Sequence, residues 1–198
     1  MKKFMFVLLA VGLIALTLVP TACKKAETPT EYSTSSVGGT SFSYPTDWTD
    51  ETASLEQGIA EGDPNYKDYI TAKGWDNPSV SAILVAIAIN LDNIPNTSMP
   101  SVLTTEMKKG FAAGFGGGFI GSLADQYSVT SQQESSADGE WAWQIEFTGK
   151  INGADAKGYL LTVFHERTAF ILAYVVKNKD WGTLGGVYNT VKGSVNFQ

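Results

Sequence analysis

Four strand-like segments follow one another in the second half of the chain, separated only by short turns. They comprise residues 126–134, 140–151, 158–166 and 168–176. The second, EWAWQIEFTGKI, alternates large apolar residues with small or polar ones, which is the period of a half-buried strand. Asn152-Gly153 is a strong signal for a two-residue hairpin, and Glu166-Arg167 joins the last two segments tightly. Connections this short permit only antiparallel pairing, because parallel strands need a crossover.

The first half of the chain supplies a central strand and a long helix. The run VSAILVAIAINL, from Val80 to Leu91, lacks polar alternation and predicts a strand covered on both faces. Residues 38–45 predict a shorter strand. Ser98 to about Ser122 predict a helix with a serine cap, frayed from about Gly116 onward.

The remaining segments complete the predicted architecture. Thr46 to Gly74 read as irregular, apart from a short strand over residues 69–72. Asp180 is placed to cap a second helix that continues to about Val191. The fold class expected from this order is α+β, with a central antiparallel sheet covered by helices.

The glycine-rich stretch KKGFAAGFGGGFIGSL, residues 108–123, allows three interpretations. Residues 116–121 match G-x-G-x-x-G, but a dinucleotide loop must follow a strand, and this segment follows helical residues. The G-x-x-x-G spacing suits transmembrane helix pairs, but the uncharged stretch from Gly110 to Ala124 is too short to span a bilayer. We expect the third, in which large apolar side chains recurring every four residues from Leu103 to Leu123 pack on the sheet. The row of glycines at residues 110, 114 and 118 then lies beside them and lets helix and sheet approach closely.

The N-terminus predicts export. Lys2 and Lys3 precede the apolar run from Phe4 to Val19, and residues 1–22 are expected to be a signal peptide. Cys23, the only cysteine, follows small residues, and the arrangement resembles the bacterial lipoprotein signal, although Pro20 stands where leucine is usual. That resemblance implies lipid attachment (palmitate among the acyl chains) at Cys23 and a location in the bacterial cell envelope. The alternative is an ordinary secretory signal with an incidental cysteine.

Composition constrains the rest of the chain. Residues 23–39 are rich in polar residues and predict a lipidated, flexible tether, which leaves 40–198 as a single domain. The net charge is −6, and Arg167 is the only arginine. Nucleic acid is therefore not an expected partner, because binding it requires phosphate neutralisation.

The sequence has few of the residues and motifs that catalyse reactions or bind metals. We therefore expect no catalytic residue, metal or cofactor. His165 is the only histidine, which excludes zinc sites built from several histidines, and it reads as a solvated turn residue. No G-x-S-x-G elbow is present. Asp63, Asp68 and Asp76 lack EF-hand spacing, so a weak calcium site there is the less favoured interpretation.

Three aromatic residues stand among polar ones in the irregular segment: Tyr66, Tyr69 and Trp75. Aromatic side chains on polar loops are enriched at recognition surfaces, so these residues form a possible partner-binding patch. The alternative, which we favour, is that they fold back and cap the sheet.

Several segments in order resemble the PsbP-like superfamily. They are SFSYPTDW (Ser41 to Trp48), DNPSVSAILVAIA, YLLTVFHERTAFILAYVV, the pair Asp180-Trp181 and the ending GSVNF. The family includes a lumenal photosystem subunit, a nuclear import factor that binds Ran, and bacterial lipoproteins. The resemblance implies an α-β-α sandwich and a mostly non-enzymatic role. Residues Thr49 to Gly74 lie outside it.

Two functional hypotheses follow, and neither is an enzyme. The first is a membrane-anchored envelope lipoprotein whose PsbP-like domain is a non-catalytic binding or assembly module with a protein partner. The second is a lipoprotein that holds a small apolar ligand between helix and sheet.

Overall fold

A seven-stranded sheet forms the centre of the computed structural model, which describes residues 26–79, 81–95, 99–151 and 153–198. Its strands are β3 (Thr49–Asp50), β4 (Ile70–Asp76), β5 (Ala82–Asn90), β6 (Asp125–Ala137), β7 (Glu140–Ile151), β8 (Ala154–His165) and β9 (Thr168–Lys177). The strand order is β3-β4-β5-β9-β8-β7-β6, and each pairing is antiparallel. The predicted meander from β6 to β9 is confirmed. Asn152 of the predicted hairpin lies outside the described residues, while Gly153 has the positive φ, +77°, that such turns require.

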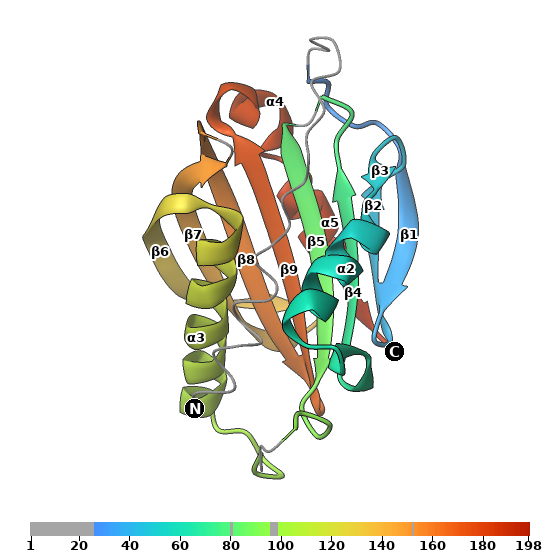
Figure 1. Ribbon diagram of the computed structural model, residues 1–198, viewed down its shortest axis with the longest axis vertical. Coiled ribbons are helices and arrows are strands. Elements are labelled where there is room, and N and C mark those ends of the chain that lie inside the picture. The colour runs from blue at the N-terminus through green and yellow to red at the C-terminus, as the bar shows by residue number, and fades with distance from the viewer. Residues whose placement is uncertain (1–25, 80, 96–98, 152) are drawn as a thin grey trace.

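Both faces of the sheet are covered, as Figure 1 shows. One face carries α2 (Thr52–Gly62), the single turn η1 (Tyr66–Asp68) and α3 (Thr105–Leu123). The other carries η2 (Asn178–Asp180), α4 (Trp181–Leu184), α5 (Val187–Gly193) and a small sheet of β1 (Tyr32–Val37), β2 (Thr40–Pro45) and β10 (Asn196–Phe197). The predicted α+β class, a sheet between helical layers, is confirmed.

Strand β5 explains why the molecule has two apolar cores. Val85 and Ile87 belong to the core under α2 and α3, whereas Leu84 and Ala86 belong to the core under α4 and α5. All four side chains are buried, because β5 lies between β4 and β9. The prediction of a strand covered on both faces is therefore confirmed.

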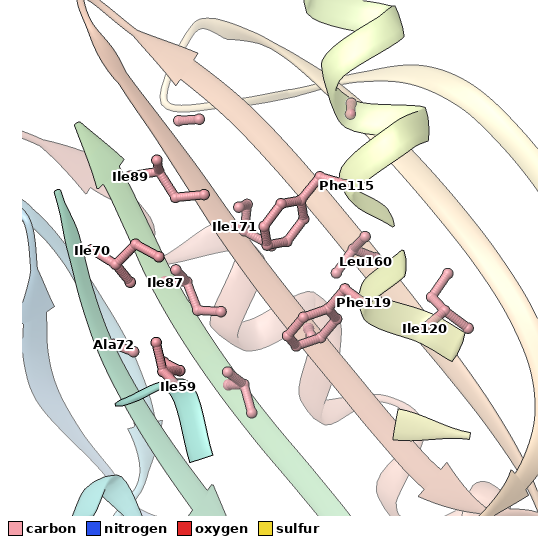
Figure 2. Close-up of a cluster of buried hydrophobic side chains, with 14 of the residues drawn as sticks. Ile59, Ile70, Ala72, Ile87, Ile89, Phe115, Phe119, Ile120, Leu160 and Ile171 are labelled. Atoms are coloured by element: carbon pink, nitrogen blue, oxygen red, sulfur yellow. The ribbon is translucent and has the colours of Figure 1, made fainter. Parts of the chain in front are cut away.

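Helix α3 closes the first core with its aromatic side chains. Phe115 and Phe119 point from the helix towards the sheet, where Ile171 and Leu160 lie (Figure 2). Both rings are almost fully buried, and their centroids are 5.8 Å apart. This part of the packing prediction for residues 108–123 is confirmed.

The glycine row was predicted on the wrong line of the helix. No atom lies within 4 Å of the position a side chain would take at Gly110 or Gly114, whereas a Cβ at Gly116 would lie 2.6 Å from Ile145 Cδ1. The row facing the sheet is therefore the one that contains Ala112, Gly116 and Ile120, four residues apart. The closest approach of helix and sheet among these glycines is at Gly116, and a Cβ at Gly121 would lie 3.1 Å from a ring carbon of Tyr127 on β6.

The predicted ends of this helix also need correction. Helix α3 begins after Thr104, whose Oγ1 accepts a hydrogen bond from the Met107 N–H at 3.3 Å. Ser98, the predicted cap, lies outside the described residues. The helix is not frayed from Gly116 but continues to Leu123, because burial of Phe119 and Ile120 offsets the low propensity of the glycines.

The prediction of a flexible tether over residues 23–39 is wrong for residues 32–37 and for Ala26. Residues 32–37 form β1, which pairs with β2 from Tyr32↔Pro45 to Val37↔Thr40. Ala26 is also buried in the second core. This segment has too little apolar surface to order itself alone, but it forms a hairpin with β2, which follows it directly across the turn at Gly38-Gly39. Residues 1–25, including the predicted signal peptide and Cys23, lie outside the described residues.

Helix α2 occupies part of the segment that was predicted to be irregular. Its propensity is low, with Thr52, Gly58 and Gly62 in a helix of 11 residues. Leu55 and Ile59 are buried against the sheet, and this contact stabilises a helix that local sequence does not specify.

Candidate functional site

A pocket of about 310 Å³ opens beside β6, which forms one edge of the large sheet. We call it the bulge pocket, because Thr130 on its rim lies at an irregularity where the register slips between Val129 and Ser131. Bulges re-aim side chains and are frequent at functional sites. The pocket is lined by Thr130, Glu146, Phe147, Thr148, Lys157, Gly158, Tyr159 and Trp181.

The sheet register holds the polar walls of the bulge pocket together. Glu146 pairs with Tyr159, and Thr148 pairs with Lys157, so residues of β7 and β8 face each other across one ladder. Trp181 at the start of α4 closes one side, with the Lys157 Nζ atom 5.6 Å from the centroid of its ring. Cation–π contacts of this kind orient a lysine without removing its charge.

The aromatic wall is anchored from the second core. The Tyr159 ring stacks on Tyr188 of α5 at 4.4 Å between centroids, and it lies 5.6 Å from Trp181. Tyr188 is in turn fixed by a hydrogen bond from its hydroxyl to Gln144 Oε1 at 3.0 Å. The pocket wall therefore rests on rigid elements rather than on a loop.

The chemistry of the bulge pocket is that of polar recognition. Burial raises the pKa of Tyr159, and the nearby Glu146 carboxylate raises it further, so the hydroxyl stays protonated as a hydrogen-bond donor. Thr130 and Thr148 add hydroxyls, and Lys157 and Glu146 bring one charge of each sign. This set suits a ligand that carries both donors and acceptors.

His165 has a partner that sequence reasoning missed. Its Nδ1 atom lies 2.9 Å from Glu140 Oε1, and its ring stacks on Phe197 with centroids 4.9 Å apart. The prediction of a solvated turn residue is therefore wrong. Glu140 begins β7 and His165 ends β8, so only the combined registers of the meander and the C-terminal strand bring these groups together.

The favoured interpretation, in which Tyr66, Tyr69 and Trp75 fold back on the sheet, is confirmed, and these residues do not form a surface patch. Tyr66, Tyr69 and Trp75 are all buried, with exposed fractions of 3%, 4% and 2%. The Tyr69 hydroxyl donates a hydrogen bond to Asp63, and Trp75 stacks on Tyr44 with ring centroids 4.6 Å apart. The interpretation as a partner-binding patch is corrected accordingly, because the three rings fill the cores above and below β4.

Asp63 and Asp76, two of the three aspartates of the possible calcium site, have different surroundings. Asp63 accepts hydrogen bonds from the Tyr69 hydroxyl and from the Asn65 N–H. Asp76 is buried, and its pKa is raised first by burial and then by Glu51. Among the described residues, no three His, Cys, Asp or Glu side chains are grouped so that they could hold a metal ion.

The alternative of an apolar ligand between helix and sheet gains no support from the packing. At Gly116 the backbone of α3 lies directly on Ile145 and Leu160. Phe115, Phe119 and other apolar side chains fill the interface beside it (Figure 2).

In the part of the chain that the structure describes, none of the helices combines the length and the apolar character needed to cross a bilayer.

Architecture and strand order define this chain as an α+β protein with a PsbP-like fold. The solution structure of cyanobacterial PsbP (CyanoP) from Synechocystis sp. PCC 6803 is similar to it, with a TM-score of 0.55 and 12% sequence identity over 92% of this chain and 99% of that one. The resemblance read from the sequence is thereby confirmed at the level of the fold.

Two further solved structures show weaker likeness. One is a protein from Bacteroides thetaiotaomicron, with a TM-score of 0.48 and 11% identity over 81% of this chain and 45% of that one. The other is LpqN, involved in cell envelope biogenesis of Mycobacterium tuberculosis, with a TM-score of 0.40 and 14% identity over 63% and 62% of the two chains. No protein-family model matches the sequence, and no curated protein does.

Proposed function

We propose that this protein is a lipid-anchored protein of the bacterial cell envelope whose PsbP-like domain binds a protein partner without catalysing a reaction. The observation that carries the proposal is the bulge pocket beside the free edge of β6. The fold, which is shared with cyanobacterial PsbP, and the lipoprotein-like sequence around Cys23 are consistent with it.

Strand β6 offers the partner an unusual length of accessible edge. It runs for 13 residues, and most of its described side chains are exposed, including Tyr127 and Val129 at 39% and 37%. Among the strands of the described residues, β7 alone pairs with it, so its outer edge is open to pairing. An extended segment of another protein can pair with such an edge. In our proposal that segment lies along β6 and places a polar group in the bulge pocket.

Site-specific photocrosslinking in the native membrane tests the docking surface. A photoreactive residue at Gln132 on β6 is expected to yield one discrete adduct, and the same residue at Gln57 on α2 should not. Neutralising the pocket with the double change Glu146→Gln and Lys157→Gln should reduce that adduct about tenfold, because buried polar groups of the partner lose charged contacts.

A matched control distinguishes a general effect of removing two charges from an effect specific to the bulge pocket. Glu61→Gln with Lys67→Gln also removes one charge of each sign, but on exposed residues outside the pocket. This pair should leave the Gln132 adduct unchanged. An adduct that survives the pocket changes, or that forms equally from Gln57, contradicts the proposed site.

The anchor is tested separately. We expect globomycin to block processing, and we expect palmitate labelling that disappears in Cys23→Ser. Release of unlabelled, soluble protein by wild-type cells would contradict anchoring at Cys23 while leaving the bulge pocket open to test.

A further inference from the structure

The described chain begins three residues after Cys23, and it is already part of the fold there. Ala26 is 6% exposed and belongs to the core that contains Trp48. Two residues later, the Thr28 hydroxyl donates a hydrogen bond to the Thr183 carbonyl oxygen of α4 at 3.1 Å. The chain therefore leaves the domain at a fixed point instead of through a long linker.

The distance available to an anchor is correspondingly short. Three residue steps, even when fully extended, reach only about 10 Å. Strand β5 alone, with nine residues, is about 30 Å long, so the anchor cannot let the domain turn over. We infer that the end of the domain around Ala26 and α4 rests against the lipid headgroups, and that the opposite end points away from the membrane. This orientation depends on the lipid attachment in the proposed function.

The surface around Ala26 consists of strand ends and short turns. A hollow of about 170 Å³ lies between the N-terminal segment, the residues after β2 and the β4–β5 turn. Lys177 N–H donates to the Ser81 carbonyl oxygen at 2.8 Å, which places the end of β9 beside that turn. Figure 1 shows the start of the blue segment and α4 at the same end of the molecule. Residues that line the hollow are Ala26, Glu27, Asp47, Trp48, Asn77, Pro78 and Ser79.

The charges at this end suit zwitterionic headgroups better than a surface of one sign. Glu27 and Asp47 are exposed beside the hollow, and Lys179 is exposed in η2 next to α4, where it lies 3.6 Å from Asp180. A lysine ammonium group at this end can donate to the phosphate of a phospholipid headgroup, and carboxylates can attract the positively charged headgroup nitrogen.

Coupling the chain to vesicles through its only cysteine tests the orientation. The mature chain from Cys23 would be attached to phosphatidylcholine vesicles that contain a maleimide lipid, and compared with the same chain capped by N-ethylmaleimide. A membrane-impermeant acylating reagent then reports the accessibility of each lysine by peptide mass spectrometry. Coupling supplies the anchor chemically, so failure of lipidation in cells and failure of the orientation give different results.

Lysines at the two ends serve as reporters. We expect Lys179 to react about fivefold more slowly on vesicles, because the bilayer lies within the short reach of the anchor. Lys67 of η1 is exposed at the other end and should react at the same rate in both samples. Equal rates for Lys179 in the two samples, or protection of Lys67 instead, would overturn the inference.

A spacer variant provides the matched control. Inserting about 20 Gly and Ser residues between Lys25 and Ala26 raises the maximum extension of the anchor from about 10 Å to about 75 Å, with an average reach of about 25 Å, and leaves the domain unchanged. The spacer should restore the reactivity of Lys179 on vesicles. Protection that persists with the spacer would show direct adsorption of the domain and would contradict an orientation set by the short anchor.

Discussion

Gly116 of α3 lies so close to Ile145 of β7 that a Cβ added at Gly116 would stand 2.6 Å from Ile145 Cδ1 and 2.9 Å from a methyl carbon of Leu160. All three residues are buried, so neither neighbour can move far. We expect Gly116→Ala to lower the free energy of unfolding by about 1–3 kcal/mol through overpacking, despite the better helix propensity of alanine. Urea denaturation checks this, and an unchanged or raised midpoint would contradict it.

Gly110 and Gly114 on the same helix should behave in the opposite way. Nothing lies within 4 Å of the position of an added Cβ at either residue, and neither backbone has a positive φ. Gly110→Ala and Gly114→Ala should therefore each raise the free energy of unfolding by about 1 kcal/mol, because alanine loses less backbone entropy in a helix. Thermal melts of the two variants, with Gly116→Ala as the internal comparison, measure this. Destabilisation at either residue would mean that α3 has a contact not seen here.

Asp76 should make stability depend on pH. Burial and then the Glu51 carboxylate raise its pKa above the usual value of 3.8. The folded protein therefore holds this proton more tightly than the unfolded chain, and the contribution of Asp76 to stability falls as pH rises through the interval above 3.8. Asp76→Asn should remove that fall, so its stability relative to wild type increases between acid and neutral pH. Denaturation at a series of pH values tests this, and parallel curves for the two proteins would refute it.

The Tyr188 hydroxyl links α5 to the sheet inside the second core. It donates to Gln144 Oε1 at 3.0 Å, which also accepts a hydrogen bond from Lys192 Nζ at 3.1 Å. Tyr188→Phe should cost about 1 kcal/mol, a modest amount because Lys192 still satisfies the Gln144 oxygen. In the double variant with Gln144→Leu the effect of Tyr188→Phe should change, since the two residues share one hydrogen bond. Additive losses in this cycle would show that the bond contributes nothing.

Local sequence patterns were enough to predict most of the central antiparallel sheet. Alternation in residues 140–151, tight turns between the last strands and the apolar run over β5 are properties of neighbouring residues, and they correctly indicated an antiparallel meander with a strand covered on both faces. The aromatic face of α3 was also readable, because rings four residues apart lie on one side of a helix.

Long-range pairing decided what the sequence left unspecified. Helix α2 exists because Leu55 and Ile59 find a sheet to cover. Strand β1, in contrast, pairs with β2 across the two-residue turn Gly38-Gly39, a local hairpin signal that the sequence analysis missed. Tyr66, Tyr69 and Trp75 are buried, as the favoured interpretation of these residues predicted, but the sequence did not say which core each of them enters.

The candidate site also depends on contacts between residues that are distant in the sequence. Thr130 reaches the bulge pocket through a register slip in β6, and Lys157 and Trp181 meet only when β8 and α4 dock. By itself, the sequence determined which segments alternate and turn, since those patterns depend on adjacent residues. Only the tertiary structure determined which faces meet, because contacts between distant residues depend on packing that no local pattern encodes.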